Sequence, residues 1–140
     1  MKHILVSAIL LIACARSFAQ DVKDLGRTYE EVREHNKLLG GVKTPKTDID
    51  TGGYKQLFYD CTDDRGMGLL FFNYSFKNNV CIAVCIGVRS KLETLQSFYN
   101  KKYQYDEDAK VWYDNVNNIA VSVTGFNDFY TVWFQPKKQK

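Results

Sequence analysis

The order of predicted elements constrains this chain most, because one helix followed by three strands occurs twice. The first helix is predicted to begin at the capping box Thr28-Tyr29-Glu30-Glu31, and the second at the capping box Ser90-Lys91-Leu92-Glu93. Side chains suited to a buried stripe then recur at helical spacing. They are Tyr29, Val32, Asn36 and Leu39 in the first helix and Leu92, Leu95, Tyr99 and Lys102–Tyr103 in the second.

Each helix is followed by three runs rich in aromatic and β-branched residues, which predict strands. The runs are Tyr54–Cys61, Gly68–Phe76 and Asn79–Val88 in the first unit, and Ala109–Asp114, Asn118–Phe126 and Phe129–Gln135 in the second. The polar stretch Val42–Gly53 is predicted to be a loop, and Asp106-Glu107-Asp108 a break. Asn78-Asn79 and Asn127-Asp128 suit tight hairpin turns, because asparagine tolerates a positive φ.

Alternation along the strands predicts which side chains share a face. If Phe126 lies opposite Phe129 in the last hairpin, its register is fixed. The pairs are then Val121–Phe134 and Val123–Val132 on the core face, with Ser122–Trp133 and Thr124–Thr131 on the other. In the run Asn79–Val88, bulky residues alternate with small ones, so we expect the bulky set to meet a helix. That set is Val80, Ile82, Val84, Ile86 and Val88; the small set is Cys81, Ala83, Cys85 and Gly87, with Phe72, Tyr74 and Phe76 filling the space beside it.

These elements predict an α+β fold in which two αβββ units form an antiparallel sheet with two helices packed on one side. A single domain spans residues 20–136, with units at about 24–88 and 89–136, and a basic tail spans residues 137–140. An internal repeat explains the order, since one unit alone would leave a sheet face bare.

Residues 1–19 are predicted to be a signal peptide. Lys2 supplies the positive start, residues 4–15 an apolar core, and Ser17-Phe18-Ala19 the small residues that a signal peptidase needs. Cleavage there makes Gln20 the first residue of an exported protein, either periplasmic or secreted. In the alternative interpretation, Leu11-Ile12-Ala13-Cys14 is a lipobox and Cys14 carries a lipid anchor at the outer membrane. After residue 19, no apolar run is long enough for a transmembrane helix.

Charge excludes one class of partner. Lys2 and Arg16 leave with the signal peptide, so the exported chain has 17 basic against 16 acidic residues. Nucleic-acid binding depends on neutralising many phosphates, and we therefore expect no nucleic-acid partner. Three of the positive charges lie in the tail, at Lys137, Lys138 and Lys140.

The exported chain keeps three cysteines, Cys61, Cys81 and Cys85. An oxidising compartment permits a disulfide, and Cys61 reaches either of the others only if their strands adjoin. Buried thiols within a sheet are the preferred interpretation. We expect no metal site, because no Cys-x-x-Cys occurs and the exported chain has one histidine. No motif indicates a cofactor.

His35 is the candidate for acid–base chemistry. It follows Glu31 by four residues on the same helix face, a spacing that brings a carboxylate close to the imidazole. A hydrolase also needs a nucleophile, and no Gly-x-Ser-x-Gly elbow is present. We therefore expect a surface histidine and no catalytic residue, and keep a small secreted hydrolase centred on His35 as an alternative.

Aromatic residues give the strongest indication of function. On the registers above, Tyr113, Phe129 and Trp133 lie on the sheet face opposite Trp112 and Phe134, and aromatic residues on both faces are unusual when one face is wet. The second face is covered by the other unit, contacts a protein partner, or binds sugars or an apolar ligand. We predict a non-enzymatic binding module that engages a protein or cell-envelope partner through Tyr113, Phe129 and Trp133. A small-ligand carrier is the other alternative.

The helical opening Gly26-Arg27-Thr28-Tyr29-Glu30-Glu31-Val32, followed by glycine and later by Pro45, resembles that of two families. These are the small outer-membrane-assembly lipoproteins of the SmpA/OmlA type and the secreted modules that are similar to β-lactamase-inhibitor protein. Both open with a Gly-x-Thr-x-x-x-Val helix that leads into a small antiparallel sheet. The resemblance covers about 20 residues and the element order. It implies a non-catalytic scaffold whose sheet face binds another protein.

Overall fold

A computed structural model describes residues 22–38, 47–61 and 68–138 of the chain. The elements are η1 (Val22–Asp24), α2 (Tyr29–Leu38), β1 (Thr47–Thr51), β2 (Tyr54–Asp60), β3 (Leu69–Lys77), β4 (Val80–Arg89), α3 (Leu92–Lys102), β5 (Gln104–Asp106), β6 (Val111–Asp114), β7 (Ile119–Phe126) and β8 (Phe129–Pro136). The predicted signal peptide, the alternative lipobox and Leu39 lie outside the described residues.

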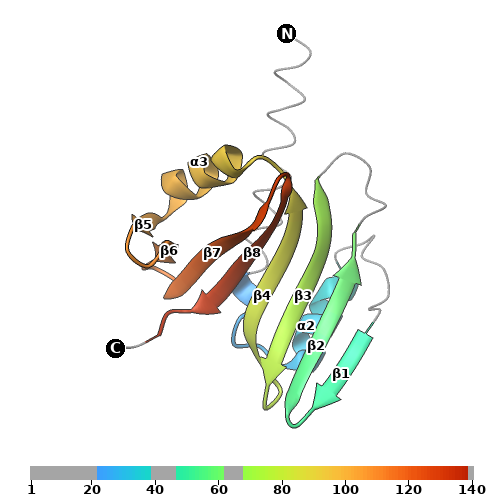
Figure 1. Cartoon of the computed structure of the whole chain (residues 1–140). Coiled ribbons are helices and arrows are strands. Elements are labelled where there is room, and N and C mark those ends of the chain that lie inside the picture. The colour runs from blue at the N-terminus through green and yellow to red at the C-terminus, as the bar shows by residue number, and fades with distance from the viewer. Residues whose placement is uncertain (1–21, 39–46, 62–67, 139–140) are drawn as a thin grey trace.

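The eight strands of the described residues form one antiparallel sheet in the order β1-β2-β3-β4-β8-β7-β6-β5. Each half of the chain is a helix followed by four strands, and the halves meet where β4 pairs with β8 (Figure 1). The α+β class is confirmed. The prediction of three strands per unit is wrong, because β1 lies inside the predicted loop Val42–Gly53 and β5 ends at the predicted break. Both are short polar strands at the edges of the sheet, where one side alone is paired.

The helices α2 and α3 pack on one side of the sheet, here called the helix face. Tyr29 of α2 meets Phe76 of β3 edge to face at 5.3 Å between ring centroids, and Tyr99 of α3 meets Phe134 of β8 at 6.4 Å. The registers of β3, β4 and β8 place Phe76 and Phe134 on the same side. Val32, Tyr99 and Phe134 are 0% exposed, so the core lies between this face and the two helices.

The two helix starts differ. In α2 the predicted capping box is confirmed, since the backbone N–H of Thr28 donates to Glu31 Oε2 at 2.8 Å and the N–H of Glu31 donates to Thr28 Oγ1 at 3.3 Å. In α3 the predicted box is wrong: Lys91 is the N-cap residue, without a side-chain cap. Leu92 is therefore not part of the buried stripe and is 36% exposed.

A β-bulge in β4 changes which residues share a face. Phe76 pairs with Cys81 whereas Ser75 pairs with Ala83, so Ile82 is an extra residue between them. Cys81 therefore lies on the helix face and Cys85 on the opposite one. The strict alternation predicted for this strand holds from Ala83 onward and is wrong before it.

The register of β3 against β4 corrects the packing predicted for β3. Phe72, Tyr74 and Phe76 lie on the helix face, within the core. Phe72 and Tyr74 pair with the bulky residues Ile86 and Val84, and the bulge leaves only Phe76 opposite a small residue, Cys81. Phe71 covers the small face instead, because a Cβ added to Gly87 would overlap its ring.

Asparagine residues form the predicted hairpin turns. Asn78 and Asn79 have φ values of 49° and 63°, and Asn127 has a φ of 57°. The predicted register of the last hairpin is confirmed at every pair, including Val121 with Phe134 and Ser122 with Trp133. Tight turns with a positive φ leave no freedom for a register slip, so turn chemistry sets the faces of β7 and β8.

Candidate functional site

The sheet face opposite α2 and α3, here called the open face, carries the three predicted partner residues. Tyr113 pairs with Ala120, Trp133 with Ser122 and Cys85, and Phe129 with Phe126 and Arg89. Phe129 is 45% exposed, and the side chains of Tyr113 and Trp133 are half-buried. Phe129 and Trp133 are four residues apart on β8, which is about 13 Å, so they form a stripe and do not stack on each other. The strands of both units extend the same sheet, so the described strands of one unit lie beside those of the other and not over their open face.

The centre of the open face is apolar with one buried polar atom. The rings of Phe58 and Phe71 lie 5.3 Å apart between centroids. Asn73 pairs with both Phe58 and Cys85, and its buried Oδ1 has no hydrogen-bond partner among the described residues. Trp133 pairs with Cys85 of β4, and Cys85 pairs with Asn73 of β3. This row therefore joins the stripe of Phe129 and Trp133 to the Phe58–Phe71 pair on the same face.

Three cations lie over aromatic rings around this centre. The Lys77 ammonium is 5.5 Å from the centroid of Tyr54, and the Arg89 guanidinium carbon is 4.6 Å from that of Phe129. The Lys137 ammonium is 4.6 Å from the centroid of Tyr113. Each pair leaves its charge at the surface while the side-chain stem covers a ring. Arg89 also faces Asp128, with 3.7 Å between Nε and Oδ2.

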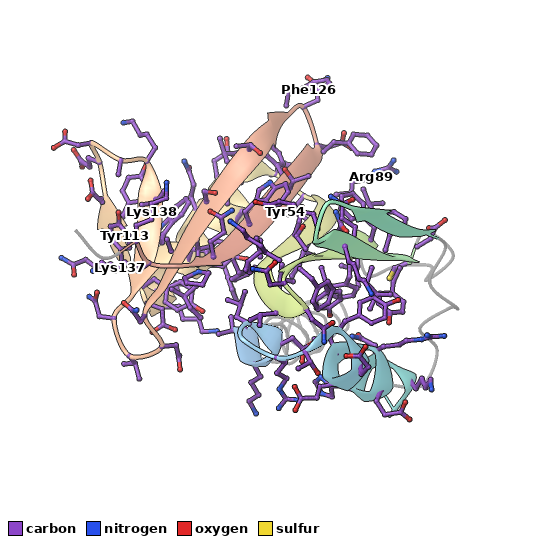
Figure 2. The ribbon with its side chains drawn as sticks, turned by 90° about the horizontal axis from the view of Figure 1, so that it is seen from below. Tyr54, Arg89, Tyr113, Phe126, Lys137 and Lys138 are labelled. Carbon is purple, nitrogen blue, oxygen red and sulfur yellow. The ribbon has the colours of Figure 1, made fainter. Side chains whose placement is uncertain are left out.

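One end of the open face is hollowed. The hollow has a volume of about 940 Å³ and lies beside Tyr113, Asn115, Gln135, Lys137 and Lys138. Figure 2 shows Tyr113, Lys137 and Lys138 close together, away from Arg89 and Phe126. Sequence reasoning placed Tyr113 on this face but missed the hollow. The shape of the hollow depends on the path of the chain after Pro136, at the end of β8. Hydrophobic periodicity does not predict that path.

His35 lies away from the open face and contacts a carboxylate that the sequence did not predict. Its Nδ1 is 2.8 Å from Oδ1 of Asp24 in η1, while Glu31 caps its own helix. The Asp24 side chain is 1% exposed and that of His35 is 20% exposed. Burial raises the pKa of Asp24, while the hydrogen bond from His35 and the charge of Arg27 oppose this rise.

Further polar groups continue this buried contact. The hydroxyl of Tyr74 donates to Oδ1 of Asn36 at 3.3 Å, and Nδ2 of Asn36 donates to the carbonyl of Val32 at 2.8 Å. Tyr74 and Asn36 are 1% and 3% exposed. The network therefore ties the C-terminal half of α2 to β3. A carboxylate at Nδ1 fixes the orientation of an imidazole, so the Asp24–His35 pair has the geometry of either a structural anchor or a general base.

The cysteines confirm the preferred interpretation. Cys61, Cys81 and Cys85 are buried, and no disulfide joins any two of them. Burial raises the pKa of the Cys81 and Cys85 thiols to about 12. Thiols of this kind are protonated at neutral pH and act as small apolar side chains.

Two further findings concern metals and membranes. Within residues 22–38, 47–61 and 68–138, no three His, Cys, Asp or Glu side chains gather as they would around a metal ion. In the same part of the chain, neither helix has the length and apolar character needed to cross a bilayer.

Comparisons with protein-family models, with curated proteins and with solved structures gave no match for this chain. The resemblance of its helical opening to the outer-membrane-assembly lipoproteins and to the β-lactamase-inhibitor-like modules therefore stays a prediction.

Proposed function

We propose that this protein is an exported, non-enzymatic binding module that engages a protein or cell-envelope component through its open face. One observation carries the proposal: Tyr113, Phe129 and Trp133 all lie on the side of the sheet opposite the helices, outside the core between sheet and helices. Tyrosine and tryptophan are enriched at the centres of protein interfaces, because they combine a large apolar area with a polar group.

The test compares partner capture with stability. Trp133→Ser and Tyr113→Ser are immobilised beside the unchanged protein and beside Val116→Ser, a control at a 93% exposed turn residue. Each is exposed to the native envelope fraction, and bound proteins are quantified by mass spectrometry. We expect Trp133→Ser to recover about thirtyfold less of a recurrent protein, as for an interface tryptophan that contributes about 2 kcal/mol. Val116→Ser should recover it fully.

Urea unfolding of the same variants separates a contact residue from a core residue. If Trp133→Ser lowers the free energy of unfolding while leaving capture unchanged, the open face is structural and the proposal is wrong. The mass of the native protein tests export, because a chain that begins at Gln20 differs in mass from one lipidated at Cys14.

The hydrolase alternative has one observation in its favour, the 2.8 Å contact between His35 and Asp24. It is the second candidate because the carboxylate of Asp24 is buried, as are the neighbouring Asn36 and Tyr74, which leaves this side of the pair closed to a substrate. His35→Gln, assayed on ester, amide and glycoside substrates against the unchanged protein, decides between the two. A hydrolysis that this substitution abolishes would favour the enzyme.

A further inference from the structure

The hollow at one end of the open face carries a chemistry that the aromatic stripe lacks. Two lysines, Lys137 and Lys138, line it beside the ring of Tyr113 and several side-chain amides. We propose that this hollow is an anion-binding subsite, which takes the carboxylates of an acidic segment on the protein partner. The inference rests on the proposed function, because it assigns a partner chemistry to one end of the same face.

Lys137 is held in position rather than left to move freely. Its backbone N–H donates to the carbonyl of Asn118 at 2.8 Å, and its Nζ donates to Oδ1 of Asn115 at 3.2 Å. Asn115 in turn donates to Oε1 of Gln104 at 3.2 Å. An ammonium group has three N–H donors, and the contacts with Asn115 and the Tyr113 ring account for two directions. The third is available to an acceptor in the hollow, and little side-chain entropy is lost when it binds.

The charge balance of the hollow favours an anion. Lys138 adds a second, exposed cation beside Lys137. Among the described residues that line the hollow, Asp106 provides the carboxylate, and its Oδ1 accepts the backbone N–H groups of Asp108 at 3.1 Å and Ala109 at 2.9 Å. This carboxylate already stabilises a turn. No second carboxylate in this lining is therefore left to neutralise the two lysines.

Ligands other than an acidic protein segment fit the hollow less well. A sugar that stacks on Tyr113 would first displace Lys137 from the ring. A nucleic-acid backbone or an anionic membrane needs a wider field of cations than two lysines set among amides. Gln135 lines the hollow and follows Trp133 by two residues on the same face, which is about 7 Å. A protein segment that contacts the aromatic stripe thus reaches the hollow without a break.

The two tryptophans make this testable by NMR, because Trp133 lies on the open face while Trp112 is buried and donates its indole N–H to Asn100. The ¹⁵N-labelled protein is titrated with hexaglutamate, hexaglutamine, inorganic phosphate, galacturonate and phosphatidylglycerol vesicles. We expect hexaglutamate alone to shift the backbone signals of Tyr113 and the side-chain signals of Asn115, with Trp112 unchanged.

Two double variants test whether Lys137 and Lys138 are the cations that bind hexaglutamate. Lys137→Gln with Lys138→Gln should weaken hexaglutamate binding about tenfold, as for two partly exposed charge contacts. Lys101→Gln with Lys102→Gln, a neighbouring pair on α3, is the matched control and should change it less than twofold. Equal weakening by both pairs overturns the proposal. The absence of a hexaglutamate response, or an equal response to phosphate, galacturonate or vesicles, overturns it as well.

The outcomes also separate this subsite from the function it rests on. If hexaglutamate does not bind while Trp133→Ser still abolishes partner capture, the subsite is wrong and the binding module stands. If hexaglutamate binds as expected while Trp133→Ser leaves capture unchanged, the anion site stands and the aromatic face is not the interface.

Discussion

The buried contact between Asp24 and His35 allows a quantitative prediction about stability. Asp24 is 1% exposed and its Oδ1 lies 2.8 Å from the imidazole Nδ1. Asp24→Ala removes this acceptor from a partly buried donor, and hydrogen bonds to charged groups contribute about 1.5–3 kcal/mol. We expect the free energy of unfolding at pH 7 to fall by about 2–3 kcal/mol, which lowers Tm by about 10 °C in a domain of this size.

Asp24→Asn separates the acceptor from the charge. Its amide oxygen still accepts from His35, so we expect a loss within about 1 kcal/mol at pH 7. Burial raises the pKa of Asp24 above its ordinary 3.8, against the opposing effects of His35, Arg27 and Tyr74. The unfolded chain therefore loses this proton at a lower pH than the folded protein. Between the two pKa values, the contribution of Asp24 to stability falls as pH rises, and asparagine removes that contribution.

Urea unfolding followed by tryptophan fluorescence, at several pH values from 4 to 7, measures both effects. Asp24→Ala and Asp24→Asn are compared with the unchanged protein in parallel. The reasoning is refuted if Asp24→Ala unfolds within about 0.5 kcal/mol of the unchanged protein at pH 7, the range typical of a surface substitution. A pH dependence in Asp24→Asn equal to that of the unchanged protein would refute the assignment of the raised pKa.

Three further predictions concern packing and thiol chemistry. Phe134→Ala removes a 0% exposed side chain from the centre of the core and should lower the free energy of unfolding by about 3–5 kcal/mol in urea titrations. Gly87→Ala should cost about 1–3 kcal/mol, because its Cβ displaces the Phe71 ring; Gly87→Ala combined with Phe71→Ala should recover part of that loss. Cys81 and Cys85, with thiol pKa values raised to about 12, should not react with a thiol reagent at pH 8 in the native protein, and both should react after unfolding in urea. Rapid native labelling of either cysteine would contradict its burial.

The C-terminal hairpin shows how far sequence reasoning reaches. Every predicted pair in this hairpin is confirmed. Its register follows from local features, namely the turn at Asn127 and the alternation of apolar and polar residues in β7 and β8. The two edge strands were missed, because the polar residues of β1 and β5 resemble loops and their pairing depends on a neighbour in the sheet. The bulge at Ile82 was missed as well, since an unpaired residue leaves no mark on hydrophobic periodicity.

The candidate site was also predicted only in part. The face of Tyr113, Phe129 and Trp133 follows from alternation within strands and was predicted. Their cationic neighbours were not, because Lys137 lies beyond the end of β8 and reaches Tyr113 of β6 past the intervening strand β7. The contact of His35 with Asp24 was not predicted either, for a related reason. Glu31 is close in sequence but caps its own helix, whereas Asp24 reaches His35 through the turn between η1 and α2.

The final strand in the sequence, β8, is an inner strand of the sheet, between β4 and β7. During synthesis, the backbone groups of β4 from Val84 to Arg89 therefore stay unpaired on this side until β8, which follows the other described strands in the sequence, has been made. Uncovered strand edges recruit other polypeptides and lead to aggregation. A nascent chain, or one that ends before Phe129, exposes this edge together with that of β7. We therefore expect a chain that ends before Phe129 to aggregate rather than to form a shortened functional protein.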